Sequence, residues 1–330
     1  MVKFYQIPDN DKLRAFNFII GGYGIGKTYS AIERAVLSYP GHFLYLRNTR
    51  EQLQESCGGF GNPFKKWCQN NNRDIMMKME KSHAVITEQT ESERLVLGWG
   101  ANLSTFENLR GVDLSSCMYG LFDEFIENRT FTFDQFKAFV RMYETVNRNR
   151  EILNEDPFKV VLLSNAQRLG NPILRGFNLI PIIENMQKTG QRTAVVNNGT
   201  VRIDLPFSEV SDAKKDTALY KATEGALFQR EALNNNFIND SFTGVKKLNI
   251  NEYTPMVAID DIYIYKHKSE VLYYVCSVQA NVKKYNSKDN FLIFYKLYGF
   301  QLKLAIGSDK VYFSDYATKV DLLTLLKMLY

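Results

Sequence analysis

The sequence predicts an α/β protein with a mostly parallel central sheet, followed by a smaller α+β domain. Short apolar runs alternate with helical patterns through the first half, which is typical of a parallel sheet covered on both faces. A glycine-rich turn joins the first apolar run to a helix, and the last third is rich in strand-like runs. We therefore expect a first domain over 1–205, a polar helical linker over 206–237 and a C-terminal domain over 238–330.

The expected elements follow from the length and periodicity of the apolar segments. In the first domain, strands are predicted at 16–20, 43–47, 84–87, 95–99, 118–122 and 160–163. Helices are predicted there at 27–37, 50–55, 134–146 and 173–177. In the C-terminal domain, strands are predicted at 257–259, 262–265 and 272–278, and an amphipathic helix at 318–329.

Residues 21–28 form the most informative segment of the chain. They fit the pattern G-x-x-x-x-G-K-[ST] and read Gly21, Gly22, Tyr23, Gly24, Ile25, Gly26, Lys27 and Thr28. Such a P-loop turns successive backbone N–H groups toward phosphate oxygens, and the following helix adds its positive N-terminus. Lys27 is expected to reach the β- and γ-phosphates, and the Thr28 hydroxyl to bind Mg²⁺. Because the sequence contains no Asn-Lys-x-Asp base-reading motif, ATP is favoured over GTP.

Two further strand ends supply polar residues that a site for ATP hydrolysis needs. One apolar run ends in Asp123 and Glu124, at the sheet edge where the P-loop also opens. Asp123 is expected to hold Mg²⁺, directly or through water, and Glu124 to orient and deprotonate the attacking water. A later run ends in Ser164 and Asn165, where ATPases with an extra strand between the two motifs carry a γ-phosphate sensor. A plain strand-terminal turn is the alternative.

Arg148 lies in the series Asn-Arg-Asn-Arg-Glu at 147–151, which ends the helix after the Asp-Glu strand. An arginine can neutralise transition-state charge on a transferring phosphoryl group with its planar fork. Arginines at a helix end can equally stabilise the helix dipole. The residues alone leave both roles open.

Composition and charge narrow the class of protein. The 330 residues contain no apolar run of about 18 or more, so no membrane span is expected. Four cysteines form no CxxC pair and three histidines are widely spaced, which argues against a zinc site and indicates reduced, cytosolic thiols. The net charge of +5 permits nucleic-acid binding without demanding it. Residues 238–330 hold twelve lysines, no arginine and eleven of the nineteen tyrosines, which suits either contact with phosphate backbones or a solvated surface over core tyrosines.

Together these motifs resemble the DNA-packaging ATPases of small short-tailed bacteriophages, a family related to terminase large subunits. The likeness is carried by Ile-Gly-Gly-Tyr-Gly-Ile-Gly-Lys-Thr at 20–28, Leu-Tyr-Leu-Arg-Asn-Thr-Arg-Glu-Gln-Leu at 44–53, Phe-Asp-Glu-Phe-Ile at 122–126, Val-Asn-Arg-Asn-Arg-Glu at 146–151 and Leu-Ser-Asn-Ala at 163–166. Residues 236–241 also resemble the family's junction into its C-terminal domain. The likeness spans most of 12–245 and fades after that.

The resemblance implies a RecA-like P-loop ATPase of the ASCE type that works as a ring motor, a homopentamer. The ring would dock on the portal of an empty procapsid in the host cytoplasm and drive double-stranded DNA inward, using ATP and Mg²⁺. Lys27 and Thr28 would form the Walker A pair, and Asp123 and Glu124 the Walker B metal ligand and catalytic base. The remaining assignments are Arg148 as an arginine finger that reaches the neighbour's ATP, Arg50 and Arg110 near the subunit interface, and Ser164 and Asn165 as a coupling motif.

For the C-terminal domain, the resemblance implies a vestigial RNase H-like nuclease that grips DNA through lysines. These are Lys246, Lys247, Lys283 and Lys284. Acidic residues are sparse there, and Asp260 and Asp261 follow a predicted strand in which neighbouring side chains face opposite sides, so only one could face a metal. A terminase with a working nuclease and a nucleic-acid-binding assembly protein switched by nucleotide are the alternatives. The sequence leaves open whether a scaffold RNA or another protein mediates docking on the portal.

Overall fold

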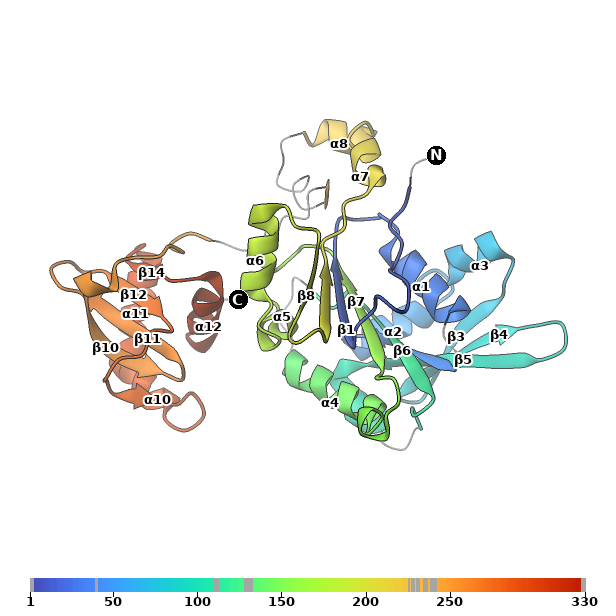
Figure 1. The fold of residues 1–330 in the computed structure, drawn as a ribbon, viewed down its shortest axis with the longest axis horizontal. Helices are drawn as coiled ribbons and strands as arrows, with labels where there is room; N and C mark the ends of the chain where they lie inside the picture. The colour runs from blue at the N-terminus through green and yellow to red at the C-terminus, as the bar shows by residue number, and fades with distance from the viewer. Residues whose placement is uncertain are drawn as a thin grey trace. The chain divides into compact units, whose positions relative to one another are not determined.

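The computed structural model describes residues 3–38, 41–109, 113–127, 133–224, 226, 229, 232–233, 237 and 242–327. The chain divides into two compact units (Figure 1). The larger unit comprises Met1–Gly176 and Asn185–Asn239, and the smaller unit comprises Phe177–Glu184 and Asp240–Tyr330. The described part of the helical segment expected at 206–237 therefore belongs to the larger unit.

A nine-stranded mixed sheet forms the centre of the larger unit, with the order β3-β4-β5-β2-β6-β7-β1-β9-β8. Its strands are β1 Phe16–Ile20, β2 His42–Arg47, β3 Ile75–Glu80, β4 His83–Gln89, β5 Arg94–Asn102, β6 Cys117–Asp123, β7 Lys159–Ser164, β8 Thr193–Val196 and β9 Val201–Asp204. From β5 to β9 in this order, neighbouring strands run parallel, whereas β3, β4 and β8 add antiparallel pairs at the edges. The mostly parallel sheet predicted from the sequence is confirmed.

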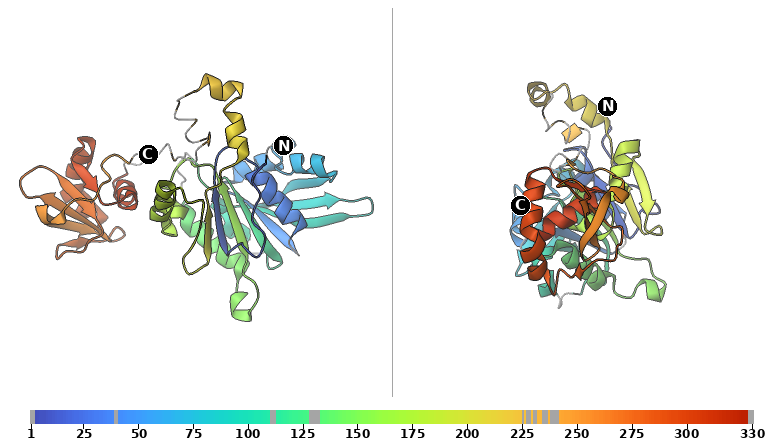
Figure 2. Two further views of the ribbon diagram at one scale, coloured as in Figure 1. Left: turned by 45° about the horizontal axis from the view of Figure 1, so that its top comes forward. Right: turned by 90° about the vertical axis from the view of Figure 1, so that its left-hand side faces the viewer.

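Helices cover both faces of this sheet (Figure 2). The helical segments of this unit before residue 225 are α1 Lys27–Leu37, α2 Arg50–Cys57, α3 Lys65–Asn71, η1 Leu103–Leu109, α4 Gln135–Asn147, η2 Glu151–Leu153, α5 Pro172–Gly176, α7 Glu209–Lys214 and α8 Ala218–Ala222. The helix α6 Ile180–Thr189 is divided between the units, because Phe177–Glu184 belongs to the smaller one. Leu121 of β6 is buried with Ile32 of α1, whereas its neighbour Phe122 stacks on Phe139 of α4. Alternation along a buried strand thus gives both faces an apolar cover.

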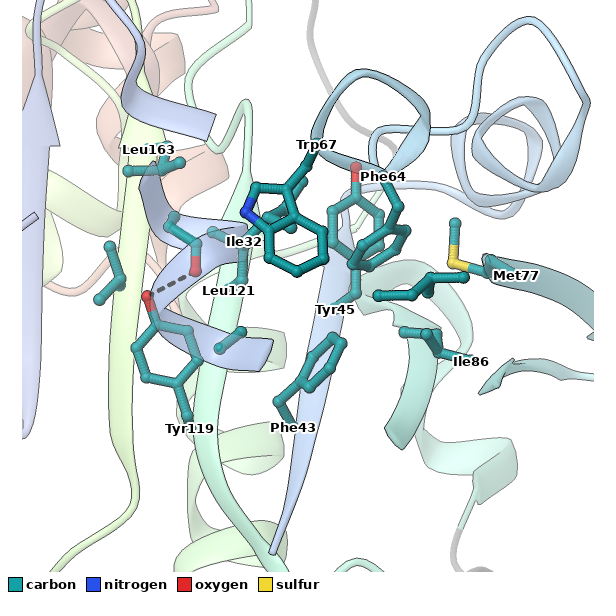
Figure 3. Packing of buried hydrophobic residues seen from close by; sticks show 14 of the residues in the cluster. Ile32, Phe43, Tyr45, Phe64, Trp67, Met77, Ile86, Tyr119, Leu121 and Leu163 are labelled. Carbon is teal, nitrogen blue, oxygen red and sulfur yellow. Dashed lines mark hydrogen bonds between the residues drawn. The ribbon is translucent and has the colours of Figure 1, made fainter. Parts of the chain in front are cut away.

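One aromatic cluster of the core lies on the face covered by α1 and α3 (Figure 3). Phe43 and Tyr45 of β2 both pack against Phe64, which immediately precedes α3. The Tyr119 hydroxyl of β6 donates a hydrogen bond to the Ala31 carbonyl of α1 at 3.5 Å (Figure 3). Burial of each large apolar side chain contributes about 1.5–3 kcal/mol. This core therefore holds β2, β6 and α1 in fixed register, and all three elements end or begin at the candidate site.

Most predicted elements are present, with small shifts at their ends. The strand at 16–20 and the helix at 27–37 have the predicted bounds. The sequence interpretation does not anticipate α3, β3, α6 or the hairpin of β8 and β9. The hairpin did have a local signal, since Asn197, Asn198 and Gly199 connect its strands with φ values of 50°, 55° and 81°. Asparagine and glycine are the residues that most readily adopt such a turn.

A five-stranded sheet forms the smaller unit, in the order β13-β10-β11-β12-β14. Its elements are η3 Ile250–Glu252, β10 Tyr253–Ile259, β11 Ile262–His267, β12 Tyr273–Cys276, β13 Lys284–Tyr285, α10 Phe291–Phe294, η4 Tyr295–Gly299, α11 Phe300–Gly307, β14 Val311–Phe313 and α12 Tyr316–Leu325. β10, β11 and β12 form an antiparallel meander, to which β13 and β14 add parallel edges. No helix among the described residues is both long and apolar enough to cross a bilayer.

The two faces of the smaller sheet pack differently. Phe294, Leu302 and Leu322 from the helices are buried on one face. The other face carries a buried cluster that includes Tyr253, Tyr263, Tyr265 and Tyr274. These four tyrosines are therefore core residues. This agrees with the second interpretation of the composition, a solvated surface over core tyrosines.

Asp260 and Asp261 follow a strand, as predicted, but the alternation argument applied to them needs correction. They do not continue a strand, because β10 ends at Ile259 and both aspartates form the turn to β11. Asp260 has φ 49° and its Oδ1 accepts a hydrogen bond from the Ser287 backbone N–H at 3.0 Å. The Asp261 carboxylate lies 3.1 Å from Lys284 Nζ. The alternation rule of a strand therefore does not decide where these two carboxylates point.

Candidate functional site

The carboxyl ends of four neighbouring strands, β2-β6-β7-β1, meet at one edge of the larger sheet. β1 runs into the P-loop, and the other three strands end in Arg47, Asp123 and Ser164. A cavity of about 350 Å³ opens at this edge. Its lining consists of residues 23–29, Asp123, Glu124 and residues 163–165. The P-loop, the Asp-Glu pair and the Ser-Asn pair predicted from the sequence therefore share one cavity.

Two glycines give the P-loop its shape. Gly24 has φ 61° and Gly26 has φ 101°, values that residues with a Cβ rarely adopt. A Cβ on Gly26 would also lie 3.2 Å from the Cβ of Phe4. The Gly21 backbone N–H donates to the Ser164 carbonyl at 3.1 Å, which ties the start of the loop to the end of β7.

Lys27 is buried and holds the loop from within. Its ammonium group donates to the Gly21 carbonyl at 3.0 Å, the Gly22 carbonyl at 2.7 Å and Asn165 Oδ1 at 3.0 Å. Burial lowers the pKa of Lys27 to about 8, although the nearby Asp123 charge acts in the opposite direction. None of the three acceptors is charged, so a phosphate oxygen would be a stronger acceptor for this amine.

Thr28 and Asp123 form the second part of the site. Thr28 Oγ1 donates to Asp123 Oδ1 at 3.1 Å. Burial raises the pKa of Asp123, while the Arg47 charge and the Thr28 hydrogen bond counteract this effect. A hydroxyl and a carboxylate are the hard oxygen ligands that Mg²⁺ takes, and a cation would offset the cost of burying the carboxylate. The pair therefore fits a magnesium site.

Arg47 is a site residue to which the sequence interpretation gives no role. Its Nη2 lies 2.6 Å from Glu124 Oε2, and its Nη1 lies 3.7 Å from Asp123 Oδ2. The Arg47 side chain is 12% exposed and the Glu124 side chain 54% exposed, so a largely buried guanidinium holds a carboxylate at the mouth of the cavity. Its position as the last residue of a predicted parallel strand was the available signal.

The backbone of Glu124 is strained, with φ 55°. A non-glycine residue in this region costs on the order of 1–3 kcal/mol and persists where its surroundings determine it. Asn48 Nδ2 donates to the Glu124 carbonyl at 3.0 Å. Gln135 Nε2 in turn donates to Asn48 Oδ1 at 2.6 Å and to the Phe125 carbonyl at 2.8 Å. This buried network fixes the turn that carries the Glu124 carboxylate.

Ser164 and Asn165 lie at the end of β7, which runs between β1 and β6. The buried Ser164 hydroxyl donates to the Ile126 carbonyl at 3.3 Å, and Asn165 Oδ1 accepts from Lys27. The pair thus contacts both the segment after Glu124 and the amine of the P-loop.

Arg148 lies at the opposite edge of the sheet. Its neighbour Arg150 donates through Nη2 to the carbonyls of Ser115 and Cys117, at the start of β6. Arg148 is 56% exposed, and its Nη2 lies 3.5 Å from Asp113 Oδ1. β6 has seven residues, and a strand of that length spans about 20 Å. An arginine side chain therefore cannot reach the P-loop of its own chain from this position.

The two arginines expected near a subunit interface differ in what the structure describes. Arg50 is the first residue of α2, just after β2, and its Nη2 donates to the Lys81 carbonyl at 3.0 Å. It therefore lies at the same sheet edge as the P-loop. Arg110 lies outside the described residues.

The lysines expected to contact DNA are all exposed on the smaller unit. Lys246 Nζ lies 3.9 Å from the centre of the Tyr312 ring, and Lys284 Nζ lies 5.9 Å from that of Tyr263. Both rings lie on the face of the smaller sheet that carries the buried cluster of Tyr253, Tyr265 and Tyr274. Lys283 lies over the ring of Tyr285, which belongs to the buried cluster on the helix-covered face. Lys283 therefore does not share a surface with Lys246 and Lys284. Lys247 is also exposed, and among the described residues it contacts no aromatic ring in this way.

Comparison with known proteins identifies the family. The sequence profile of the Podovirus DNA encapsidation protein (Gp16) family matches residues 4–302. The chain belongs to this family. Among Gp16-like relatives, the DNA packaging proteins of Bacillus phages PZA and phi29 are each 25% identical over 242 residues. Each match covers 71% of this chain and 65% of the relative, so the chain spans about two thirds of the length of these relatives.

Solved structures with the Gp16-like fold include two packaging motors. A chain of the bacteriophage Phi-29 viral genome packaging motor assembly gives a TM-score of 0.62 at 17% identity, covering 99% of this chain and 100% of that one. A chain of the Phi-28 gp11 DNA packaging motor gives a TM-score of 0.60 at 16% identity, covering 96% and 95%. At these identities the likeness concerns the fold alone.

Proposed function

We propose that this chain is the ATPase subunit of a ring motor that moves double-stranded viral DNA into a procapsid. The observation that carries the proposal is the arrangement of Lys27, Thr28, Asp123 and Glu124 around one cavity at the end of a parallel sheet. Membership of a DNA encapsidation family supports the same conclusion. A P-loop with this carboxylate pair is typical of a nucleotide hydrolase rather than of a protein that only binds phosphate.

Each residue of the site has a chemical role in this proposal. Thr28 and Asp123 would hold Mg²⁺, which neutralises charge on the transferring phosphoryl group. Lys27 would exchange its neutral acceptors for oxygens of the β- and γ-phosphates of ATP. Glu124 would orient the attacking water and accept its proton. Asn165, through its contact with Lys27, and Ser164 would sense the change at the γ-phosphate.

Arg148 completes the site from a neighbouring subunit in this proposal. Its exposure and its position at the edge opposite the P-loop support action between chains. A second cavity of about 530 Å³ lies beside Asn165, and Glu51, Glu55, Glu124 and Glu127 are among the residues that line it. A guanidinium group from another subunit has the charge that such a lining attracts. Arg50 and Arg110 are proposed to be basic residues near a subunit interface.

The assembly and domain roles extend the proposal. Residues 1–205 would form the ATPase domain, 206–237 the helical connection and 238–330 the DNA-gripping domain. Five copies would form the ring on the procapsid portal in the host cytoplasm, with a scaffold RNA or another protein as the adaptor. Because cargo of any sequence must be moved, the grip would act on DNA phosphates through Lys246, Lys247, Lys283 and Lys284.

A vestigial nuclease is the proposed origin of the C-terminal domain. Asp260 is engaged by the Ser287 backbone, and Asp261 is paired with Lys284. A carboxylate bonded in this way is less available to a metal ion, which supports DNA binding without cleavage.

Stimulation of ATP hydrolysis by linear double-stranded DNA tests the proposed function. The purified protein is expected to hydrolyse ATP with Mg²⁺, and DNA is expected to raise the rate while plasmid DNA in the same reaction stays intact. Nicking or linearisation of the plasmid would favour the terminase with a working nuclease. ATP binding without any turnover, with or without DNA, would favour the nucleotide-switched assembly protein.

Nucleotide affinity is expected to fall as the pH rises above 8. Burial lowers the pKa of Lys27 to about 8, so the free protein loses this positive charge in that range, whereas bound phosphate favours the charged form. Binding at pH 9 should be about tenfold weaker than at pH 7 and should take up a proton. Calorimetry in two buffers of different ionisation enthalpy measures this uptake. Lys27→Arg should flatten the profile, and equal affinities for the unmodified protein at both pH values would contradict the prediction.

A further inference from the structure

Tyr23 is the point at which three separate segments meet on the P-loop. Its hydroxyl accepts a hydrogen bond from Gln167 Nε2, just beyond Asn165, at 3.0 Å. Its ring packs against a small buried cluster of Tyr220, Ala232 and Leu233 from the helical segment after residue 206. Its backbone carbonyl accepts a hydrogen bond from Lys214 Nζ. The loop is therefore in contact with the end of β7 and with the helical segment at the same residue.

Lys214 lies directly against the backbone of the P-loop. A Cβ built on Gly24 would be 2.9 Å from Lys214 Nζ. Its charge is close enough to Lys27 to contribute to the lowered pKa of that residue. Burial also lowers the pKa of Lys214 itself. Two amines are thus held close together at a loop whose geometry suits a polyanion.

The other end of α7 is anchored, so the position of Lys214 is set by the fold. Lys214 is the last residue of α7, which begins after Ser208. The Ser208 hydroxyl donates to the Lys3 carbonyl at 3.0 Å, and the Lys3 N–H donates to Glu209 Oε2 at 3.1 Å. Two residues after Lys3, in the segment before β1, the Tyr5 N–H donates to the Ile25 carbonyl at 2.9 Å. Residues 3–5, α7 and the P-loop are thus each hydrogen-bonded to the other two.

We propose that Lys214 is a second nucleotide-binding cation, which exchanges the Tyr23 carbonyl for a polyphosphate oxygen when the P-loop is occupied. This inference rests on the proposed nucleotide site. A hydrogen bond between a charged donor and a charged acceptor is roughly twice as strong as one with a neutral acceptor, so the phosphate competes successfully with the carbonyl. The exchange draws the end of α7 toward the nucleotide. Occupancy of the loop is thereby coupled to the helical segment that precedes the smaller unit in sequence.

Lys215 provides a matched control, because it is the next residue and carries the same side chain. Its Nζ lies 2.6 Å from Asp212 Oδ1, and both side chains are 55% exposed. Lys214→Met is expected to weaken binding of a fluorescent ATP analogue about tenfold or more, since a hydrogen bond to a charged group contributes about 1.5–3 kcal/mol. Lys215→Met should bind within about twofold of the unmodified protein, because an exposed pair contributes little. Lys214→Arg keeps the charge and should recover most of the affinity.

Hydrogen exchange distinguishes direct binding from a merely structural role. In the unmodified protein and in Lys215→Met, the ATP analogue should slow amide exchange over residues 209–223, and in Lys214→Met it should not. Lys214→Met with unchanged affinity and unchanged nucleotide-dependent protection would overturn the proposal. If the unmodified protein binds no nucleotide and Lys27→Ala behaves identically, the proposed function fails instead. A thermal melt of each variant confirms that the comparison is between folded proteins.

Discussion

Glu124→Gln is expected to abolish ATP turnover while leaving ATP binding intact. The amide has the shape of the carboxylate, so the turn held by Asn48 can form, but a neutral amide cannot accept the proton of the attacking water. General-base catalysis contributes about 10²–10⁴-fold, and the steady-state hydrolysis rate should fall by this factor. Lys27 and Thr28 are unchanged, so the dissociation constant of an ATP analogue should remain within a few-fold.

Glu33→Gln is the control for this substitution. Glu33 lies on α1, outside the residues that line the cavity, and the change removes the same charge from the chain. Its hydrolysis rate should match that of the unmodified protein. Unimpaired hydrolysis by Glu124→Gln would refute its assignment as the base. Loss of ATP binding would instead indicate that the pair with Arg47 is needed to shape the cavity.

Arg148→Ala protein is expected to be inactive alone and to regain activity when mixed with Glu124→Gln protein. Arg148 lies at the sheet edge opposite its own P-loop and cannot reach a nucleotide bound there, so the proposed finger acts in trans. In a mixed ring, an intact P-loop and Glu124 from one chain meet an intact Arg148 from the other. Arginine fingers contribute about 10³–10⁵-fold to the hydrolysis rate, so even partial recovery is measurable.

The design separates catalysis from stability. Arg148 has φ 49°, and alanine carries the same Cβ, so the substitution adds no backbone strain. The pair with Asp113 is exposed and contributes little to folding. Arg141→Ala, at an exposed position of α4, should retain full activity. A mixture that stays inactive under conditions where mixed rings form would leave the action in trans without support.

The features that were predicted correctly from the sequence are those formed by residues adjacent in the chain. The P-loop joins a strand and a helix whose bounds were predicted without error, because a buried strand, a glycine-rich turn and an amphipathic helix each have a local pattern. The Asp-Glu and Ser-Asn pairs end apolar runs and therefore share the carboxyl edge of a parallel sheet. Asp260 and Asp261 lie between two strands, as predicted, but the alternation of a strand was applied to them although they form a two-residue turn.

The features that could not be predicted from the sequence are contacts between segments that are distant in the chain. Arg47 bonds to Glu124 across 77 residues of chain, and Lys214 bonds to Tyr23 across 191. No periodicity links such positions, because the order of strands and the packing of α7 decide which side chains approach the loop. For Arg148 the residues alone left a helix cap and an arginine finger open, and only the packing of the segment after α4 against the start of β6 locates it at the far edge.

The sequence by itself predicted a phosphate-binding loop and two polar strand ends, since each depends on neighbouring residues. Its alternating strand-like and helical runs also predicted a mostly parallel sheet. The tertiary structure decided that Arg47 pairs with Glu124, that Lys214 contacts the loop and that Arg148 lies at the sheet edge opposite its own cavity. Strand order and helix direction are set by the packing of the whole unit, and they determine which distant charges share a site.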